Sequence, residues 1–195
     1  MNQDTVSTAR TLIADGKGIL AADETPGTLT KRFDALGIRS TAESRRAYRE
    51  LLFTAPDAAT SISGVIMQDE TIRQKSSTGI PLAQLLASRG IVPGIKVDTG
   101  AKPLALAPGE TVTEGLDGLR DRLAEYRGMG ARFAKWRAVI HIADGLPTGA
   151  CVSANAHALA RYAALCQEAS LVPIVEPEVL MDGPHSIERC EEVTT

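Results

Sequence analysis

Residues 132–140 read RFAKWRAVI, and residues 172–180 read VPIVEPEVL. Each is a short apolar run with charged side chains set inside it, which is typical of a strand buried on both faces. Between them, residues 154–167 carry Leu159, Tyr162 and Cys166 at helical spacing. Strand, helix and strand in this order predict a right-handed crossover unit of a parallel sheet.

The same alternation extends toward the amino terminus. Further apolar runs predict strands at 18–23, 62–67 and 92–98. Periodic apolar residues predict helices at 5–14, 42–53, 82–88 and 116–128, and a last helix opening near Ile187. Thr41 and Ser44 give the helix at 42–53 a cap-like start. We therefore expect an α/β fold with five parallel strands buried on both faces.

Two parallel architectures fit this alternation, the barrel and the doubly wound sheet. The residues after the first strand, DETPGTLT at 23–30, contain no G-x-G-x-x-G, and the chain has no G-x-x-x-x-G-K-[ST] motif. Charged residues near the carboxyl ends of the strands favour a TIM (β/α)8 barrel. Residues 1–195 are then a single domain that holds only about the first five βα units, and five strands cannot close a barrel, so the sheet edges stay unpaired.

Composition limits which binding partners and which cellular compartment we expect. The chain has 21 Lys+Arg against 24 Asp+Glu and a net charge of −3, which gives no footprint for nucleic acid or an anionic membrane. Neither a signal peptide nor an apolar run long enough to span a membrane is present, so we expect a cytoplasmic protein. The three cysteines match no zinc or disulfide pattern and are expected to be free thiols. The three histidines lack metal-ligand spacing, so no metal is expected. We predict no other cofactor either.

Ionisable groups gather at the predicted strand ends. They are Asp23 and Glu24, Lys96 and Asp98, Lys135 and Arg137, and Glu176 and Glu178. Members two residues apart share one face of a strand, so a barrel mouth lined by them would hold cations beside carboxylates. One interpretation is a structural ion-pair network, because buried charges are costly unless paired. The other is imine chemistry, which needs an amine of lowered pKa and a carboxylic acid to expel water from a carbinolamine.

Arginines offer a second clue. Arg137, with Arg32, Arg45 and Lys31, could hold an anion such as phosphate, since a guanidinium presents a bidentate fork. Arginines on a helix, such as Arg45 and Arg46, are equally typical of a solvated face. The residues alone name no substrate.

Successive blocks of the chain resemble class I fructose-bisphosphate aldolase in order and spacing. The most specific are GIKVD at 94–98, FAKWR at 133–137 and VPIVEPE at 172–178, preceded by GKGILAADET at 16–25. The resemblance covers nearly the whole chain. It implies a (β/α)8 barrel that cleaves fructose 1,6-bisphosphate to dihydroxyacetone phosphate and glyceraldehyde 3-phosphate through a lysine Schiff base, with no metal.

The resemblance also implies a role for each matching residue. Asp23 would bond the substrate hydroxyl at the cleaved bond, Glu176 would be the general acid/base, and Glu178 would pair with the reactive lysines. Lys135, with Lys96, would contact substrate and keep the site electropositive. Arg137 would bind substrate, Arg32 matches a phosphate-binding arginine, and Arg45 is a weaker match of the same kind. The substrate partner is thus a sugar phosphate, and the complete enzyme is expected to be a homo-tetramer.

Two departures from the family pattern matter. Pro26 and Gly27 change the loop beside Asp23. The imine-forming lysine of the family lies on a sixth strand in a Leu-Leu-Lys-Pro-like block, and no such block precedes Thr195. We therefore expect the chain to be the amino-terminal part of an aldolase, lacking the Schiff-base lysine and inactive alone.

Three hypotheses follow. The first is a partial sequence of a working class I aldolase. The second is a smaller Schiff-base lyase in which Lys135 or Lys96 is the nucleophile. The third is an inactive truncated product that acts as an interaction segment through its open sheet edge.

Overall fold

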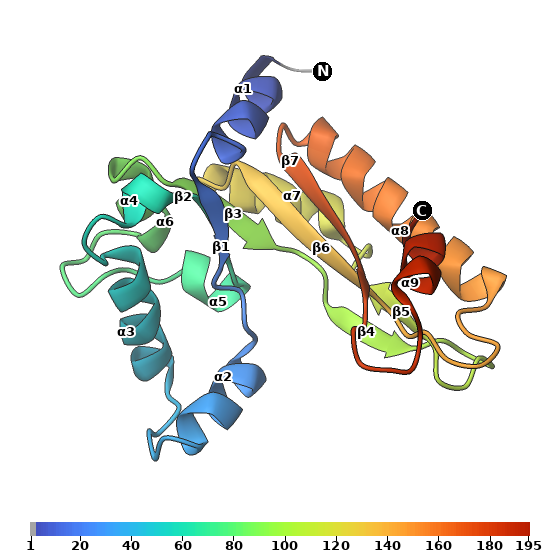
Figure 1. The fold of residues 1–195 in the computed structure, drawn as a ribbon. Coiled ribbons are helices and arrows are strands. Elements are labelled where there is room, and N and C mark those ends of the chain that lie inside the picture. Colours follow the sequence, from blue (N-terminus) through green and yellow to red (C-terminus); the bar gives the residue numbers. More distant parts are fainter. Residues whose placement is uncertain (1–2) are drawn as a thin grey trace.

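The structure, a computed structural model, describes residues 3–195 and is built on one five-stranded parallel sheet. The sheet order is β1-β2-β3-β6-β7, formed by β1 (Gly18–Ala21), β2 (Ile62–Met67), β3 (Val92–Lys96), β6 (Phe133–Ile140) and β7 (Val172–Val179). All four pairings are parallel, and β1 and β7 are the edges of an open, curved sheet (Figure 1). The prediction of five parallel strands in an unclosed barrel is confirmed.

Helices connect and cover these strands. They are α1 (Gln3–Leu12), α2 (Pro26–Asp34), α3 (Ala42–Phe53), α4 (Ala58–Ser61), α5 (Asp69–Ile72), α6 (Leu82–Ser88), α7 (Leu119–Gly128), α8 (Gly149–Glu168) and α9 (Ile187–Thr194). Helix α3 matches its predicted bounds, and Thr41 and Ser44 form a reciprocal capping box. Among residues 3–195, no helix combines the length and the apolar character that crossing a membrane requires.

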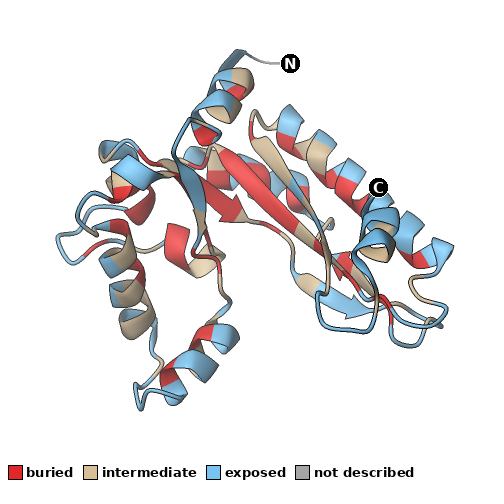
Figure 2. Ribbon diagram, viewed as in Figure 1, coloured by how far each residue is buried: buried red, intermediate tan, exposed pale blue. Residues whose placement is uncertain are grey.

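The outer face of the sheet carries the main core. Ile95 and Trp136 point toward the covering helices, where they meet Leu86 of α6, Leu123 of α7 and Tyr162 of α8. Figure 2 shows this burial as red along β6 and on the sheet-facing sides of the helices behind it. The Trp136 ring lies 5.5 Å from that of Tyr162, centroid to centroid, and is fully buried.

The inner face holds a smaller apolar cluster near the amino ends of the strands. Leu12 of α1 packs there against Ile66 and Phe133. The Phe133 ring lies over Gly64 and Gly94 on neighbouring strands, and a Cβ atom at Gly94 would overlap that ring. Glycine at position 94 therefore leaves room for the Phe133 ring on the inner face.

Burial differs from the prediction at the two edges. The residues of β1 and β7 are mostly half-buried or exposed, whereas those of β2 and β3 and most of β6 are buried or nearly so. The expectation of full burial on both faces was wrong for β1 and β7, because an edge strand has only one neighbouring strand.

A hairpin that the sequence did not predict interrupts the crossover between β3 and β6. Strands β4 (Gly100–Pro103) and β5 (Thr111–Glu114) pair antiparallel as a separate two-stranded sheet. Side chains of β5 bond the main chain of β6, with Thr113 Oγ1 donating to the Arg137 carbonyl at 2.8 Å and Thr111 Oγ1 to the Val139 carbonyl at 2.9 Å. The hairpin thus stands beside the carboxyl half of β6 (Figure 1).

Candidate active site

The inner face of the sheet changes character along the strands. On β6, residues of alternate position begin with Phe133 and continue with Lys135 and Arg137. On β7, Ile174 of the apolar cluster gives way to Glu176 and Glu178 in the same alternation. Apolar side chains therefore fill the amino end of this face, and charged ones occupy the carboxyl end.

Lys135 is the centre of this charged group. Its Nζ atom lies 3.2 Å from Asp23 Oδ2 and 3.1 Å from Glu176 Oε2. Asp23 follows β1, so the lysine bridges the first strand and the last strand of the sheet. Only 6% of Lys135 and 9% of Asp23 is exposed, so the ion pair between them is largely shielded from water, whereas 33% of the Glu176 side chain is exposed.

The electrostatics of Lys135 bear on the imine interpretation. Burial alone would lower the pKa of this amine, but the charges of Asp23 and Glu176 and the hydrogen bonds to them outweigh burial, so the pKa lies above its usual 10.5. Imine chemistry requires an amine of lowered pKa, and the shift at Lys135 is in the opposite direction. Its two carboxylate partners keep it protonated, which suits a cation and proton donor rather than a free amine nucleophile.

Arg137 forms a second pair beside the first. Its Nη2 atom donates to Glu178 Oε1 at 2.6 Å, and its Nε atom lies 4.0 Å from Glu176 Oε1. The hydrogen bonds that Arg137 donates to the Glu178 carboxylate raise the pKa of the guanidinium. Because 38% of the Arg137 side chain is exposed, this pair faces the open side of the site.

Lys96 completes the inner-face cations. It is the register partner of Lys135 across β3 and β6, so two ammonium-bearing residues occupy neighbouring strands at one level. Lys96 Nζ pairs with the Asp98 carboxylate and donates to the Asp98 carbonyl at 3.2 Å. These contacts agree with the expected shared faces, because Lys96 pairs with Asp98, and Lys135 and Arg137 both lie within 4.0 Å of Glu176.

The remaining two predicted arginines lie on the helices α2 and α3 rather than on the sheet. Arg32 pairs with Glu24 at 2.5 Å. Arg45 makes a bidentate pair with Glu70, at 2.8 Å from Nε and 2.7 Å from Nη2. Within residues 3–195 the structure does not bring either guanidinium into the Lys135 network.

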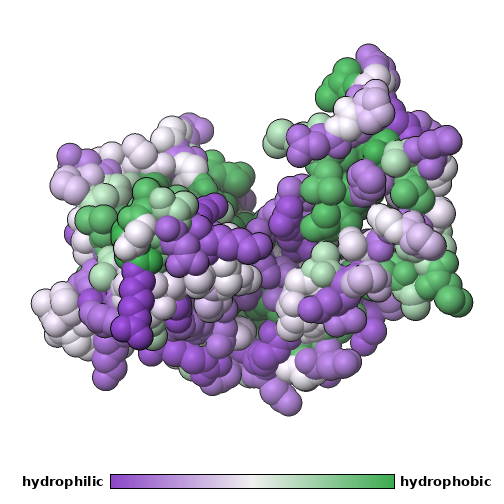
Figure 3. All heavy atoms as spheres, turned by 90° about the horizontal axis from the view of Figure 1, so that it is seen from below, coloured by the Kyte–Doolittle hydropathy of each residue, from purple (hydrophilic) through white to green (hydrophobic). Residues whose placement is uncertain are grey.

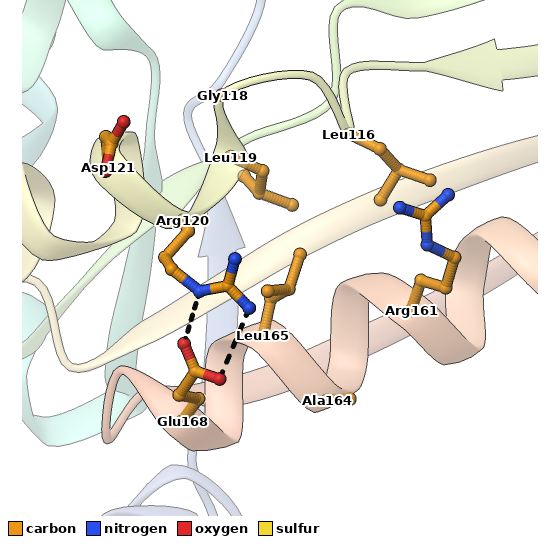
Figure 4. A pocket seen from close by; sticks show the side chains of 9 residues that line it. All are labelled: Leu116, Gly118, Leu119, Arg120, Asp121, Arg161, Ala164, Leu165 and Glu168. Carbon is orange, nitrogen blue, oxygen red and sulfur yellow. Dashed lines mark hydrogen bonds and ion pairs between the residues drawn. The ribbon is translucent and has the colours of Figure 1, made fainter.

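Two cavities adjoin helix α7. The view from below shows a hollow between two masses, with both hydrophilic and hydrophobic atoms on its walls (Figure 3). A cavity of about 640 Å³ lies between helix α7 and the segments that follow β1, β2 and β3, and Lys96 and Asp98 are part of its lining. A second cavity, of about 460 Å³, lies between α7 and α8, where Arg120 pairs with Glu168 at 2.6 Å (Figure 4). None of the predicted site residues lines this second cavity.

Within the described part of the chain, no group of three histidine, cysteine, aspartate or glutamate side chains is placed to hold a metal ion. The three cysteines are free thiols, with Cys151 and Cys166 buried.

Sequence reasoning gave too little weight to several residues. Arg49 on α3 is 1% exposed and pairs with Glu24 at 2.7 Å, although an arginine in a helical pattern reads as solvated. Its partner Glu24 directly follows Asp23 in the sequence, which was the available signal. Asp98, whose side chain is 2% exposed, was visible only as a neighbour of Lys96.

The fold and this site define an incomplete (β/α) barrel enzyme scaffold, with lysines and carboxylates at the carboxyl ends of its strands. A family model described as class-I fructose-bisphosphate aldolase matches residues 4–195, so the chain belongs to the class I fructose-bisphosphate aldolase family.

Individual relatives agree with this family. The chain is 64% identical over 187 residues to a "Probable fructose-bisphosphate aldolase class 1" of Xanthomonas campestris, covering 96% of this chain and 56% of that relative. It is 55% identical to "Fructose-bisphosphate aldolase 6, cytosolic" of Arabidopsis thaliana, covering 92% of this chain and 50% of that protein. The chain thus spans about half the length of the curated relatives it matches.

A solved structure extends the likeness to three dimensions. The aldolase of Plasmodium falciparum, crystallised with TRAP and a small-molecule inhibitor, superimposes with a TM-score of 0.95 at 48% sequence identity. The match covers 98% of this chain and 56% of that one. The predicted TIM-barrel architecture and the resemblance to the family are both confirmed.

Proposed function

We propose that this chain supplies the substrate-orienting and acid/base part of a metal-independent, Schiff-base fructose-1,6-bisphosphate aldolase. The reaction is the reversible cleavage of the sugar bisphosphate to dihydroxyacetone phosphate and glyceraldehyde 3-phosphate, in glycolysis and gluconeogenesis. The observation that carries the proposal is the Lys135 ammonium held between Asp23 and Glu176 at the barrel mouth. Membership of the family supports it.

Proton transfer is the first role of these residues. Glu176 would donate a proton to the carbinolamine hydroxyl, which leaves as water, and Asp23 would accept the proton of the hydroxyl at the cleaved carbon bond. Lys135 bonds both carboxylates, so it can hold their orientations and stabilise negative charge that develops between them. Glu178 would hold Arg137 in place.

Substrate binding is the second role. Lys96 and Arg137 are the inner-face cations beside Lys135, and Arg32 and Arg45 are those on the neighbouring helices. Each is paired with a carboxylate in this structure. A bound phosphate would compete for these pairs, since a phosphate is a bidentate partner for arginine.

The wider setting belongs to the same proposal. The imine-forming amine would come from a sixth strand outside residues 1–195, as the family resemblance implies. The complete enzyme would be a cytoplasmic homo-tetramer without a cofactor. The cytosolic description of the Arabidopsis relative supports the compartment.

A second candidate, an interaction segment, is favoured by the exposed apolar residues on and after β7. Val175 is 46% exposed, Met181 90% and Ile187 76%. Sedimentation of the isolated chain tests this candidate. Association with a partner or with itself supports it, and a well-behaved monomer argues against it.

A chimera tests the proposed enzyme directly. The chain is joined to the remaining carboxyl-terminal part of the Xanthomonas relative, and aldol cleavage is measured beside that relative unchanged. We expect the chimera to cleave fructose 1,6-bisphosphate at a comparable rate. A folded chimera without activity, next to an active relative, would contradict the proposal.

Within the chimera, Glu176→Gln tests the proton-transfer role. We expect turnover to fall by about 10²–10⁴-fold, the usual contribution of general acid–base catalysis, with little change in stability. The control is Glu192→Gln, which alters an exposed carboxylate on α9 paired with Arg189. Unchanged turnover in Glu176→Gln would refute the assigned role.

A further inference from the structure

Asp98 has an arrangement that its position after a strand does not require. Its side chain is 2% exposed and takes donors from three directions. Oδ1 pairs with Lys96 Nζ and also accepts from the Gly100 amide at 3.1 Å, while Oδ2 accepts from the Arg137 amide at 3.2 Å. One buried carboxylate therefore joins the end of β3 to the middle of β6.

The backbone pairing explains why β6 needs this carboxylate. The last main-chain bond between the two strands runs from the Val97 amide to the Lys135 carbonyl at 3.1 Å. In a regular parallel ladder the Arg137 amide would next donate to the Val97 carbonyl. That carbonyl instead accepts from Arg122 Nη1 at 2.9 Å. Asp98 Oδ2 takes the vacated place as the acceptor for Arg137.

The chain diverges from the sheet at this point. Residues after Asp98 turn into β4 with Gly100 at φ +100°, and the carbonyls of Arg137 and Val139 are then bonded by side chains of β5. Asp98 is thus the last group of the β3 segment that touches β6. Its Oδ1 atom contacts the Lys96 ammonium on the inner face, and its Oδ2 atom accepts a hydrogen bond from the Arg137 amide of β6.

We propose that Asp98 is a positioning residue that fixes Lys96 and Arg137 relative to each other across β3 and β6. This inference rests on the proposed function, in which those two cations bind the sugar phosphate. The carboxylate acts through them and does not touch substrate. Without it, Lys96 keeps no carboxylate partner among the described residues, and the Arg137 amide loses its acceptor.

Nuclear magnetic resonance of the chain itself tests this positioning. With ¹⁵N-labelled lysine, an ammonium held in an ion pair exchanges slowly and gives a correlation signal. We expect such signals from Lys96 and Lys135 in the wild type, and loss of the Lys96 signal alone in Asp98→Asn. The Arg137 amide should also exchange at least about tenfold faster in that variant, as expected for loss of a hydrogen bond to a charged group.

The matched control is Glu110→Gln. Glu110 is another buried carboxylate of this region, and it accepts from the Thr148 amide at 2.6 Å without touching Lys96 or Arg137. We expect it to leave the Lys96 signal in place. Loss of the Lys96 signal in both variants, or its retention in Asp98→Asn, would overturn the proposal.

The wild type decides the matter even if Asp98→Asn does not fold. The Arg137 amide donates to the Asp98 carboxylate, so we expect its slow exchange to depend on that side chain. An Arg137 amide that exchanges as fast as that of an exposed loop would overturn the proposal. Slow exchange together with a Lys96 ammonium signal supports it.

Titration with fructose 1,6-bisphosphate separates this inference from the proposed function. We expect binding by the wild type that weakens about tenfold in Asp98→Asn and is unchanged in Glu110→Gln. If the wild type shows the Asp98-dependent signals but binds no sugar phosphate, the proposed substrate is wrong, whereas the positioning role of Asp98 still stands. Equal binding by wild type and folded Asp98→Asn would overturn a positioning role in substrate binding.

Discussion

The two faces of the five-stranded sheet are built from the same strands and serve different ends. The outer face is mainly apolar and packs Trp136 and Ile95 against α6, α7 and α8. The inner face is apolar only at its amino end, around Phe133, and carries Lys135 and Glu176 beyond it. Because side chains alternate between the two faces of a strand, the core residue Trp136 directly follows the site residue Lys135 in the sequence.

The difference indicates where stability resides. Outer-face side chains are held by close-packed neighbours that leave little room for change. Inner-face charges are held by ion pairs that cost desolvation and contribute less to folding. We therefore expect substitutions on the outer face to cost stability, and those among the inner charges to cost function.

The largest effect is expected at Trp136. Trp136→Ala should lower the free energy of unfolding by about 3–5 kcal/mol, because it leaves a large cavity in the outer-face core. Urea denaturation measures the loss. Trp136→Phe keeps an aromatic ring beside Tyr162 and should cost clearly less. Equal stability of Trp136→Ala and wild type would break the comparison between the faces.

The apolar end of the inner face comes next. Gly94→Ala should destabilise by about 1–3 kcal/mol, since the new methyl group overlaps the Phe133 ring. In a Phe133→Ala background the same change should cost much less. Gly128→Ala in α7, where no atom lies within 4 Å of the new carbon, is the control and should be neutral or mildly stabilising. Additive costs at Gly94 and Phe133 would show that the overlap is not the cause.

The ion pairs of Lys135, at the charged end of the inner face, should make stability depend on pH. The folded-state pKa of Lys135 is raised above 10.5, so its contribution to stability is fully present at neutral pH and is lost as pH rises through that folded value. Unfolding of the wild type and of Lys135→Met is compared at pH 7 and at pH values above 10.5. The difference in stability between them should shrink at the alkaline end. A difference that grows with pH would mean that the amine is held neutral.

The smallest effect concerns thiol reactivity. Burial raises the pKa of Cys166, in the outer-face core, to about 12, and burial likewise raises that of Cys151. Cys190 on α9 is only partly buried. At mildly alkaline pH, a thiol reagent should label Cys190 first in the native chain and the other two only on unfolding. Rapid labelling of Cys166 in Cys190→Ser would contradict a closed outer core.

The sequence predicted the elements whose signals are local and strong. The strands at 62–67 and 92–98 and the helix at 42–53 were found from apolar runs and a cap. The β4–β5 hairpin was missed because its strands have four residues each and are held by side chains of β5 on distant β6. Helix α2 was missed although Thr25 and Pro26 form a cap and first-turn signal.

Within the site, the alternation of side chains along a strand predicted which charged residues share a face. It did not predict their ion-pair partners or the direction of the pKa shift. The fold brings Asp23 and Glu176 to Lys135 from the two edges of the sheet. These two carboxylates raise the pKa of the Lys135 amine. Guanidinium chemistry and the family resemblance both made Arg32 and Arg45 candidate phosphate-binding residues, and the structure pairs each of them with a nearby glutamate. Those roles stay predictions.

Reductive trapping tests the central claim most directly. The chimera with the Xanthomonas carboxyl-terminal part is incubated with dihydroxyacetone phosphate, treated with borohydride and mapped by peptide mass spectrometry. The claim that Lys135 is a charged acid/base partner predicts a single adduct outside residues 1–195, with Lys96 and Lys135 unmodified. An adduct on Lys135 or Lys96 would contradict it and would favour the smaller Schiff-base lyase.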